Sequence, residues 1–369
     1  MPEFYIGLMS GTSLDGVDGV LADVSPATPL VIPHACRPFP SALRSELLAL
    51  NTGGNDELHR AALAGNALAR VYSEVVHELL ASARAPAQSI VAIGAHGQTV
   101  RHRPQEFDGT GYTLQLNQPA LLAELTGIDV VADFRSRDVA AGGQGAPLAP
   151  FFHQSLFSRP GQSIGVLNIG GISNITLLRA DGSMLGFDCG PGNALIDGWI
   201  QQHRSLDYDS EGSWAAEGSV LQTLLERLRS EPYFRRLPPK STGRDLFNQA
   251  WLEHQLHDFT AASPQDVQAT LTELTASACA GEVLRHEPHL TRLIVCGGGA
   301  LNTHLMARLR SLLPGAVVES SGQFGLPPLQ VEATAFAWLA RKTVRREKLE
   351  LKSTTGARGA RVLGCVYPA

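Results

Sequence analysis

Hydrophobic positions along this chain follow two periods in turn. Apolar runs of strand length, often flanked by glycine, predict β-strands at 4–10, 17–24, 89–97, 127–134, 163–171, 172–180, 184–188 and 292–299. Apolar residues three and four apart predict an amphipathic helix over 56–83. Two further helices are expected, one at 117–125 with Asn117 as N-cap and Pro119 in its first turn, and one at 263–284 capped by Ser263. Alternating strands and helices indicate an α/β fold.

Two stretches of the chain share one plan. Residues 5–25 and 163–183 each read as an apolar strand, a turn of glycine and small polar residues, and a return strand that ends near an aspartate. Later in each half, "IVAIGAHGQT" and "LIVCGGGALN" both show a buried strand that ends in small residues. This pattern favours duplicated halves, and hence two lobes with a ligand between them, although chance similarity between glycine hairpins is an alternative.

Composition narrows the class of protein. A chain of 369 residues, 44% hydrophobic and 18% charged, predicts a globular protein of two domains or one large one. A net charge of −5 with no broad basic field argues against a nucleic-acid partner, and the basic run at 341–348 is expected to be a solvated helix end. No signal peptide or bilayer-length apolar run is found, and five scattered cysteines without a CxxC pair predict reduced thiols, so we expect a cytoplasmic protein without a membrane partner.

The glycine turns raise the question of phosphate binding. "GLMSGTSLDG" at 7–16 fits an ordinary tight hairpin, and it equally fits a turn whose backbone N–H groups bind an anion. In the second interpretation Ser10, Thr12 and Ser13 add hydroxyl donors, while Asp15 or Asp18 holds Mg²⁺ or its water shell. The second copy, "NIGGISN" at 168–174, strengthens the phosphate hypothesis. "GGGALN" at 297–302 fits either a nucleoside contact or close backbone packing, and no P-loop motif is present.

Eight ordered motifs together resemble one family. They are "GLMSGTSLDGVD" (7–18), "GAHGQT" (94–99), "ADFRSRD" (132–138), "GGQGAPL" (142–148), "NIGGISN" (168–174), "GFDCGPGN" (186–193), "KSTGRDLFN" (240–248) and "CGGGALN" (296–302). The chain resembles the anhydro-N-acetylmuramic acid kinases, bacterial enzymes of the superfamily of sugar kinases, heat-shock chaperones and actin. The resemblance implies a two-lobed, actin-like (ribonuclease H-like) fold with duplicated lobes around an ATP cleft, and a homodimer. We place the lobe boundary near 135, giving lobes of 1–135 and 136–369, with the packing of the C-terminal tail left open.

The same resemblance assigns site residues. ATP is expected to contact the first hairpin, the second hairpin and the later glycine turn, through Ser10, Gly11, Thr12, Ser13, Leu14, Asp15, Gly16, Val17, Asp18, Asn168, Gly170, Gly171, Gly297, Gly298, Gly299 and Asn302. The sugar is expected to contact His96, Gln98, Asp133, Arg135 and Glu332. Arg135, or else Arg137, is the candidate partner of the sugar's lactyl carboxylate. Glu332 equally fits a helix N-terminal carboxylate. Lys240 and Arg244 either touch ligand or pair with acids.

The family's reaction converts 1,6-anhydro-N-acetylmuramic acid, ATP and water into N-acetylmuramic acid 6-phosphate and ADP, in peptidoglycan recycling. Atom O6 of this sugar is an ether oxygen without a proton, so water must attack C1 while O6 takes the γ-phosphoryl group. Glycoside hydrolysis ordinarily needs two carboxyl groups, but here phosphorylation of O6 replaces the acid, so one base suffices. Asp188 matches the family's catalytic aspartate. Two rival hypotheses are a kinase of an ordinary sugar hydroxyl and an actin-like regulatory ATPase.

Overall fold

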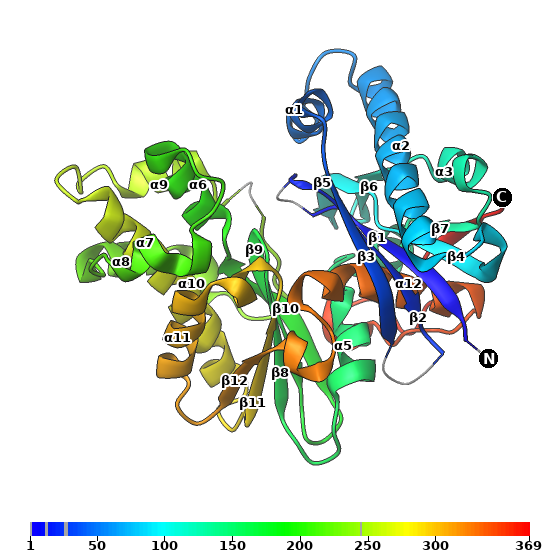
Figure 1. The fold of residues 1–369 in the computed structure, drawn as a ribbon. Coiled ribbons are helices and arrows are strands. Elements are labelled where there is room, and N and C mark those ends of the chain that lie inside the picture. Colours follow the sequence, from blue (N-terminus) through cyan, green and yellow to red (C-terminus); the bar gives the residue numbers. More distant parts are fainter. Residues whose placement is uncertain (1, 12–13, 26–28, 244–245) are drawn as a thin grey trace. The chain divides into compact units, whose positions relative to one another are not determined.

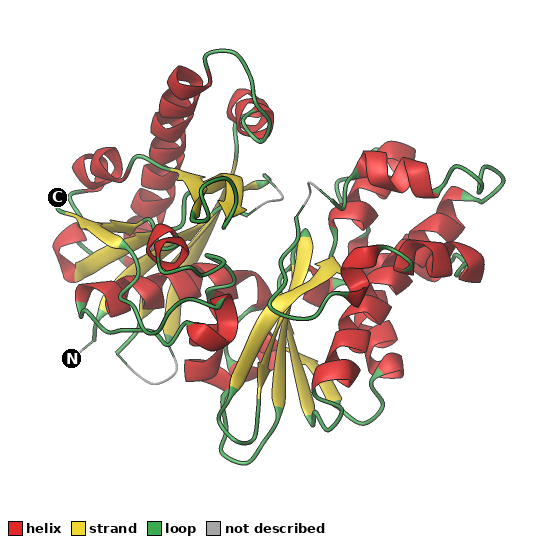
Figure 2. Cartoon of the chain, turned by 180° about the vertical axis from the view of Figure 1, so that it is seen from behind, coloured by secondary structure: helices red, strands yellow, loops and turns green. Residues whose placement is uncertain are grey.

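The computed structural model describes residues 2–11, 14–25, 29–243 and 246–369, which form two compact units. Unit 1 comprises Met1–Leu156 and Gln330–Ala369, and unit 2 comprises Phe157–Leu329. Each unit contains one large sheet covered by helices, as Figures 1 and 2 show.

The chain passes into unit 2 at Leu156–Phe157 and not near residue 135, because the segment after 135 is bonded to the C-terminal part of unit 1. Thr355 donates its hydroxyl to Asp138 over 2.6 Å, and Gln144 N–H donates to the Thr355 carbonyl.

The sheet of unit 1 has the strand order β13-β7-β4-β1-β2-β3. Its strands are β1 (Phe4–Met9), β2 (Gly16–Asp23), β3 (Leu30–Pro38), β4 (Ile90–Ala95), β7 (Val130–Ala132) and β13 (Cys365–Tyr367). β1, β2 and β3 pair antiparallel, whereas β4 pairs parallel to β1 and to β7. The C-terminal strand β13 adds to β7 at the edge. A separate two-stranded sheet joins β5 (Gln98–Pro104) to β6 (Gly111–Leu116).

The sheet of unit 2 repeats this arrangement. Its order is β10-β9-β8-β11-β12, from β8 (Ile164–Ile169), β9 (Ile172–Leu178), β10 (Met184–Pro191), β11 (Arg292–Cys296) and β12 (Val317–Ser320). Three antiparallel strands are again followed by two parallel ones, with the first strand of the unit in the centre. The predicted correspondence of 5–25 with 163–183, and of β4 with β11, is therefore confirmed at the level of topology.

Helices cover both faces of the first sheet. Those of unit 1 are α1 (Ser41–Ala49), α2 (Glu57–Ala83), α3 (Pro119–Thr126), α4 (Ser136–Ala140), α12 (Val331–Val344) and α13 (Lys352–Thr355), and α5 (Ala149–Phe157) reaches the boundary with unit 2. A Cβ on Gly7 would lie 1.8 Å from the Ala333 carbonyl of α12, whereas one on Gly19 would meet Val75 of α2. Gly19 pairs with Leu8, the neighbour of Gly7, so α12 and α2 cover opposite faces of the sheet.

In unit 2 one helix connects two hydrophobic clusters. The unit contains α6 (Ala194–Arg204), α7 (Ser213–Ala216), α8 (Gln222–Arg229), α9 (Gln249–Gln255), α10 (Pro264–His286) and α11 (Thr303–Leu312). The first half of α10 packs with α6 and α8 through Val267, Leu271 and Leu274, and its second half packs against the sheet through Cys279 and Val283. Ser263 caps α10 as predicted, accepting from Asp266 N–H over 3.1 Å.

Two local predictions need correction. The N-cap of α3 is Gln118, not Asn117, whose carboxamide oxygen instead accepts from Gln118 N–H over 2.9 Å. The basic run at 341–348 is only partly solvated, because Arg341 is mostly buried and forms a 2.9 Å ion pair with Glu3. Arg345 also pairs with Glu3, and Lys342 pairs with Glu347. In the described part of the chain, no helix has the length and hydropathy needed to cross a membrane.

Candidate active site

The first glycine hairpin is bonded to the loop that follows β4. Gly97 N–H donates to the Tyr72 hydroxyl over 3.1 Å, and the Ser10 hydroxyl donates to the Gly97 carbonyl over the same distance. Tyr72 and Ser10 share a further 2.9 Å hydrogen bond. With the Ser10 proton on Gly97, Tyr72 must donate to Ser10, which closes a ring of three bonds among buried groups. Gln98 Nε2 adds a 3.1 Å bond to the Gly11 carbonyl.

The predicted site residues of this network differ in whether their hydrogen-bonding atoms already have a partner. The Ser10 proton is already used inside the protein, so the remaining hydrogen-bonding capacity of its hydroxyl is that of an acceptor. Gln98 is buried, and its Oε1 has no hydrogen-bond partner among the described residues. A sugar hydroxyl would satisfy this orphan acceptor. The predicted donors Thr12 and Ser13 lie outside the described residues.

His96 and Arg135 form the polar centre of unit 1. Arg135 donates from Nη2 and Nε to His96 Nε2 over 2.8 and 3.1 Å, and from Nη1 to the Gly145 carbonyl over 2.8 Å. A guanidinium only donates, so His96 Nε2 must be the acceptor and the imidazole is neutral with its proton on Nδ1. Burial, together with the nearby charge of Arg135, holds the pKa of His96 well below its usual value. The guanidinium of Arg135 is therefore fixed in orientation.

The other two predicted sugar ligands, Asp133 and Glu332, lie on chain segments that carry or contact this pair. Asp133 follows β7 with a φ of 56°, is exposed, and accepts from Ser136 N–H over 3.3 Å. Glu332 lies in the first turn of α12, four residues before Phe336, and residues four apart share a helix face. The Phe336 ring is 4.7 Å from the imidazole of His96. Thus His96, Arg135 and Glu332 come from one region of unit 1.

The two predicted metal ligands are placed differently. Asp15 is exposed, and its carbonyl accepts from Phe39 N–H. The carboxylate of Asp18 lies 3.3 Å from His34 Nε2 and is 41% exposed. No group of three or more His, Cys, Asp or Glu suited to a metal occurs in the part of the chain that the structure describes.

In unit 2 the second hairpin turns at Gly170–Gly171, as expected. Their carbonyls accept from the start of the next helix, with Asn193 N–H donating to Gly170 over 2.7 Å and Gly192 N–H to Gly171 over 2.9 Å. The cross-strand pairing sets Asp188, Asn174, Asn168 and Cys296 in one row across four strands. Asp188 and Asn168 are two strands apart, hence about 10 Å.

The glycine turn after β11 lies beside this hairpin. A Cβ on Gly297 would lie 2.5 Å from Asn168 Oδ1, and one on Gly299 would lie 2.4 Å from the Ile169 side chain. Among the described residues, a Cβ on Gly298 would have one neighbour within 4 Å, the side-chain Nδ2 of Asn193, at 3.3 Å. Close packing therefore explains the first and third glycines, and Gly298 is left as the candidate ligand contact. The Asn302 carboxamide oxygen caps α11 by accepting from Leu305 N–H over 2.9 Å.

Asp188 is fixed by the segment whose role the sequence leaves open. Thr242 N–H donates to Asp188 Oδ2 over 3.0 Å, and Asp188 N–H donates to the Lys240 carbonyl over 3.2 Å. The Tyr233 hydroxyl donates to the Asp188 carbonyl over 2.7 Å. The Lys240 ammonium does pair with an acid, the buried Glu282, at 2.8 Å. Arg244 lies outside the described residues.

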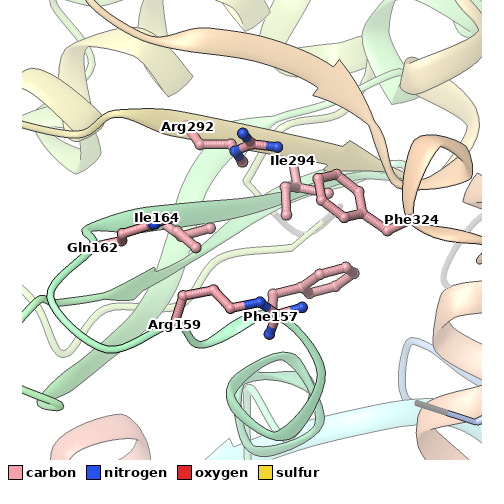
Figure 3. Close-up of a pocket in the computed structure, with 7 residues that line it drawn as sticks. All are labelled: Phe157, Arg159, Gln162, Ile164, Arg292, Ile294 and Phe324. Carbon is pink, nitrogen blue, oxygen red and sulfur yellow. The ribbon is translucent and has the colours of Figure 1, made fainter.

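A cavity of about 210 Å³ in unit 2, shown in Figure 3, contains none of the predicted site residues. It lies near Ile164 and Arg292, where β8 and β11 begin, so it is at the opposite end of these strands from the glycine turns. Arg292 is already paired with Glu319 over 2.6 Å and stacks on Phe324. This cavity is not the site of the predicted chemistry.

A five-strand plan that occurs twice, each time with a glycine hairpin at the end of its first strand, defines a protein of the actin-like fold. A reductive activator for a corrinoid, iron–sulfur protein shares this fold, with a TM-score of 0.51 at 13% identity over 96% of this chain and 63% of that one. Residues 3–369 match the family model for anhydro-N-acetylmuramic acid kinase. The anhydro-N-acetylmuramic acid kinase of Variovorax paradoxus (strain S110) is 65% identical over 372 residues, covering 100% of this chain and 99% of the relative.

A second relative, the anhydro-N-acetylmuramic acid kinase of Albidiferax ferrireducens, is 60% identical over all of both chains. The chain therefore belongs to the anhydro-N-acetylmuramic acid kinase family and is an ATP-using kinase. Sequence reasoning missed Tyr72, Tyr233 and Thr242. Tyr72 and Tyr233 form hydroxyl bonds to distant backbone groups, for which a single sequence carries no signal. Thr242 lies in the motif at 240–248, whose presence the sequence shows but whose role it does not indicate.

Proposed function

We propose that this protein opens the 1,6-anhydro bond of 1,6-anhydro-N-acetylmuramic acid and phosphorylates O6, releasing ADP and N-acetylmuramic acid 6-phosphate for peptidoglycan recycling. The observation that supports it most is the fixed orientation of the Asp188 carboxylate. This residue pairs with Asn174 of the second hairpin, and its Oδ2 accepts a hydrogen bond from Thr242 N–H. A base that must accept a proton from one water molecule needs such a fixed orientation.

In the proposed reaction Asp188 takes a proton from water as the water oxygen bonds to C1. The electron pair of the C1–O6 bond goes to O6, which forms a bond to the γ-phosphorus, and the bond from phosphorus to the ADP oxygen breaks. Attack on the face opposite O6 inverts C1 and gives an α-anomer. Catalysis of the phosphoryl transfer rests on positioning and on charge stabilisation.

The remaining residues have binding roles in this proposal. The two hairpins and Gly298 contact ATP, while His96, Gln98, Asp133 and Glu332 contact the sugar. Arg135, oriented by His96 and the Gly145 carbonyl, is suited to the lactyl carboxylate because a guanidinium forms paired hydrogen bonds with a carboxylate. The exposed Asp15 and the half-exposed Asp18 fit Mg²⁺, which binds through one or two carboxylates plus phosphate oxygens and water. Bound there, Mg²⁺ would neutralise phosphate charge.

The test follows ¹⁸O from labelled water into product, using the anhydro sugar and ATP. We expect ¹⁸O at C1 of a 6-phosphorylated α-anomer, and a loss of at least about 10³-fold in kcat for Asp188→Asn, because the base is removed. Asp181→Asn, in the exposed turn between β9 and β10, is the control and should keep full activity. A β-anomer contradicts the geometry. Phosphorylation of hexoses with a free O6 in place of the anhydro sugar, or ADP release without phosphorylated sugar, contradicts the function.

The resemblance also supports a cytoplasmic homodimer. Sedimentation of the purified protein at micromolar concentration tests the dimer, and fractionation of cells tests the location. A monomer across that range, or recovery with the membrane fraction, contradicts these two proposals without touching the chemistry.

A further inference from the structure

A buried ion pair is formed by a residue whose backbone is bonded to the base Asp188. The side chains of Lys240 and Glu282 are 2% and 6% exposed, with Nζ and Oε1 separated by 2.8 Å. The Lys240 ammonium also lies 4.8 Å from the Tyr233 ring centroid and 5.7 Å from that of Phe187. Lys240 is thus held by a carboxylate and two aromatic faces, all in unit 2.

The backbone of the same lysine is bonded directly to the base. Its carbonyl accepts from Asp188 N–H, and two residues later Thr242 N–H donates to Asp188 Oδ2. Tyr233, the ring beneath the ammonium, donates its hydroxyl to the Asp188 carbonyl. The three bonds to Asp188 therefore come from Lys240 itself, from Thr242 two residues later, and from Tyr233, whose ring contacts the Lys240 ammonium.

Stability alone does not explain a buried ion pair here. Removing two charges from water costs free energy that their attraction often fails to recover, so an apolar pair of similar volume is commonly as stable. What the ion pair adds is a fixed position. Hydrophobic contacts alone are non-directional and would allow residues 240–242 to shift along α10, whereas a 2.8 Å bond to Glu282 of that helix does not.

We propose that Lys240, through its ion pair with Glu282, is a positioning residue that fixes the carboxylate of Asp188 for attack by water. The proposal rests on the proposed function, because it takes Asp188 as the base. In this proposal Lys240 acts through Asp188, because its own side chain is buried and paired with Glu282. A misplacement of about 1 Å at a reacting group can lower a rate by about 10²-fold, which sets the size of the expected effect.

The experiment compares Lys240→Met with the double variant Lys240→Met/Glu282→Leu. The single variant removes the 2.8 Å partner of Glu282 and leaves this buried carboxylate with His286 Nε2 at 3.2 Å and Arg285 Nη1 at 4.0 Å. We therefore expect lower stability and a loss of about 10²-fold in kcat, with both KM values within about twofold. The double variant removes both charges and should regain wild-type stability while kcat stays low. Recovery of kcat together with stability overturns the proposal, as does a kcat of Lys240→Met within about threefold of wild type.

Two further measurements make the result unambiguous. Arg308→Met breaks another ion pair of unit 2, with Glu273 at 2.7 Å, and should lower stability without changing kcat. Hydrogen exchange of the Thr242 amide reports its bond to Asp188 without turnover, and we expect exchange at least about 10-fold faster in the double variant. An unchanged exchange rate of the Thr242 amide overturns the positioning role, whether or not the wild type has the proposed activity. Absence of that activity in the wild type refutes the proposed function alone.

Discussion

Tyr72→Phe removes one oxygen atom at the point where the first glycine hairpin meets the loop after β4. The Tyr72 hydroxyl accepts from Gly97 N–H over 3.1 Å and lies 2.9 Å from the Ser10 hydroxyl. Burial raises the pKa of Tyr72 far above its usual value, so the group is a neutral hydroxyl at any pH of interest. The ring is fully buried and Phe refills the same space, so the substitution deletes hydrogen bonds without creating a large cavity.

The expected cost follows from the groups left behind. Gly97 N–H becomes a buried donor without its acceptor, at about 1–3 kcal/mol, and Ser10 loses one of its two bonds, at about 1 kcal/mol. A central value of about 2–3 kcal/mol results after allowing for the more apolar Phe ring. Local opening at Gly97 should become easier by a similar amount, which corresponds to an exchange rate about 30- to 150-fold faster.

Urea unfolding gives the first quantity, and hydrogen exchange of the Gly97 amide gives the second. Tyr208→Phe is the control, because Tyr208 is 65% exposed and its loss of a hydroxyl should change the unfolding free energy by less than about 0.5 kcal/mol. Ser10→Ala and the double variant complete a double-mutant cycle whose coupling energy should be nonzero. A Tyr72→Phe protein with unchanged unfolding free energy and unchanged Gly97 exchange would refute the three-bond ring.

Three other predictions concern acid stability, packing and ligand binding. Burial lowers the pKa of His153 to about 3, so below pH ~6.5 only the unfolded chain takes up this proton. The unfolding free energy should therefore fall by about 1.4 kcal/mol for each pH unit of acidification. In urea unfolding from pH 7 to 4, the unfolding free energy of His153→Gln should depend less steeply on pH than that of the exposed control His59→Gln. Gly7→Ala puts a Cβ 1.8 Å from the Ala333 carbonyl and should cost about 3 kcal/mol or more in thermal unfolding, whereas Gly53→Ala, with open space, should be neutral. ATP at about 100 times its Kd should raise the unfolding free energy by about 2.7 kcal/mol, and its removal by dialysis should reverse the shift.

Hydrophobic patterning predicted the central strands because each carries its own signal. β1 and β8 are continuous apolar runs, and the glycine turns after them mark where the chain reverses. The cap of α3 was misassigned because Asn117 and Gln118 both precede Pro119, and only the backbone geometry shows which one begins the helix. The edge strand β13 has three residues, too few for a period to show.

The partners of the site residues could not be predicted for a different reason. Tyr72 is separated from Ser10 by 62 residues and Lys240 from Glu282 by 42, so neither pair leaves a local pattern. Tyr72 occupies a position of α2 that any large apolar side chain would satisfy in the helical period. The motif "KSTG" was noticeable, but its function lies in backbone groups of Lys240 and Thr242, whose direction no side-chain pattern encodes.

The discontinuous course of unit 1 has a consequence for synthesis on the ribosome. Unit 2 is one uninterrupted segment, and Phe157 and Phe324, near its two ends, have ring centroids 5.7 Å apart. All strands of its sheet have therefore been translated before unit 1 is complete. The face of β1 and β4 that carries Gly7 and Gly94 is covered by α12, which is translated only after all of unit 2. A nascent chain arrested before residue 331 therefore presents an uncovered strand face, a surface that chaperones and proteases recognise.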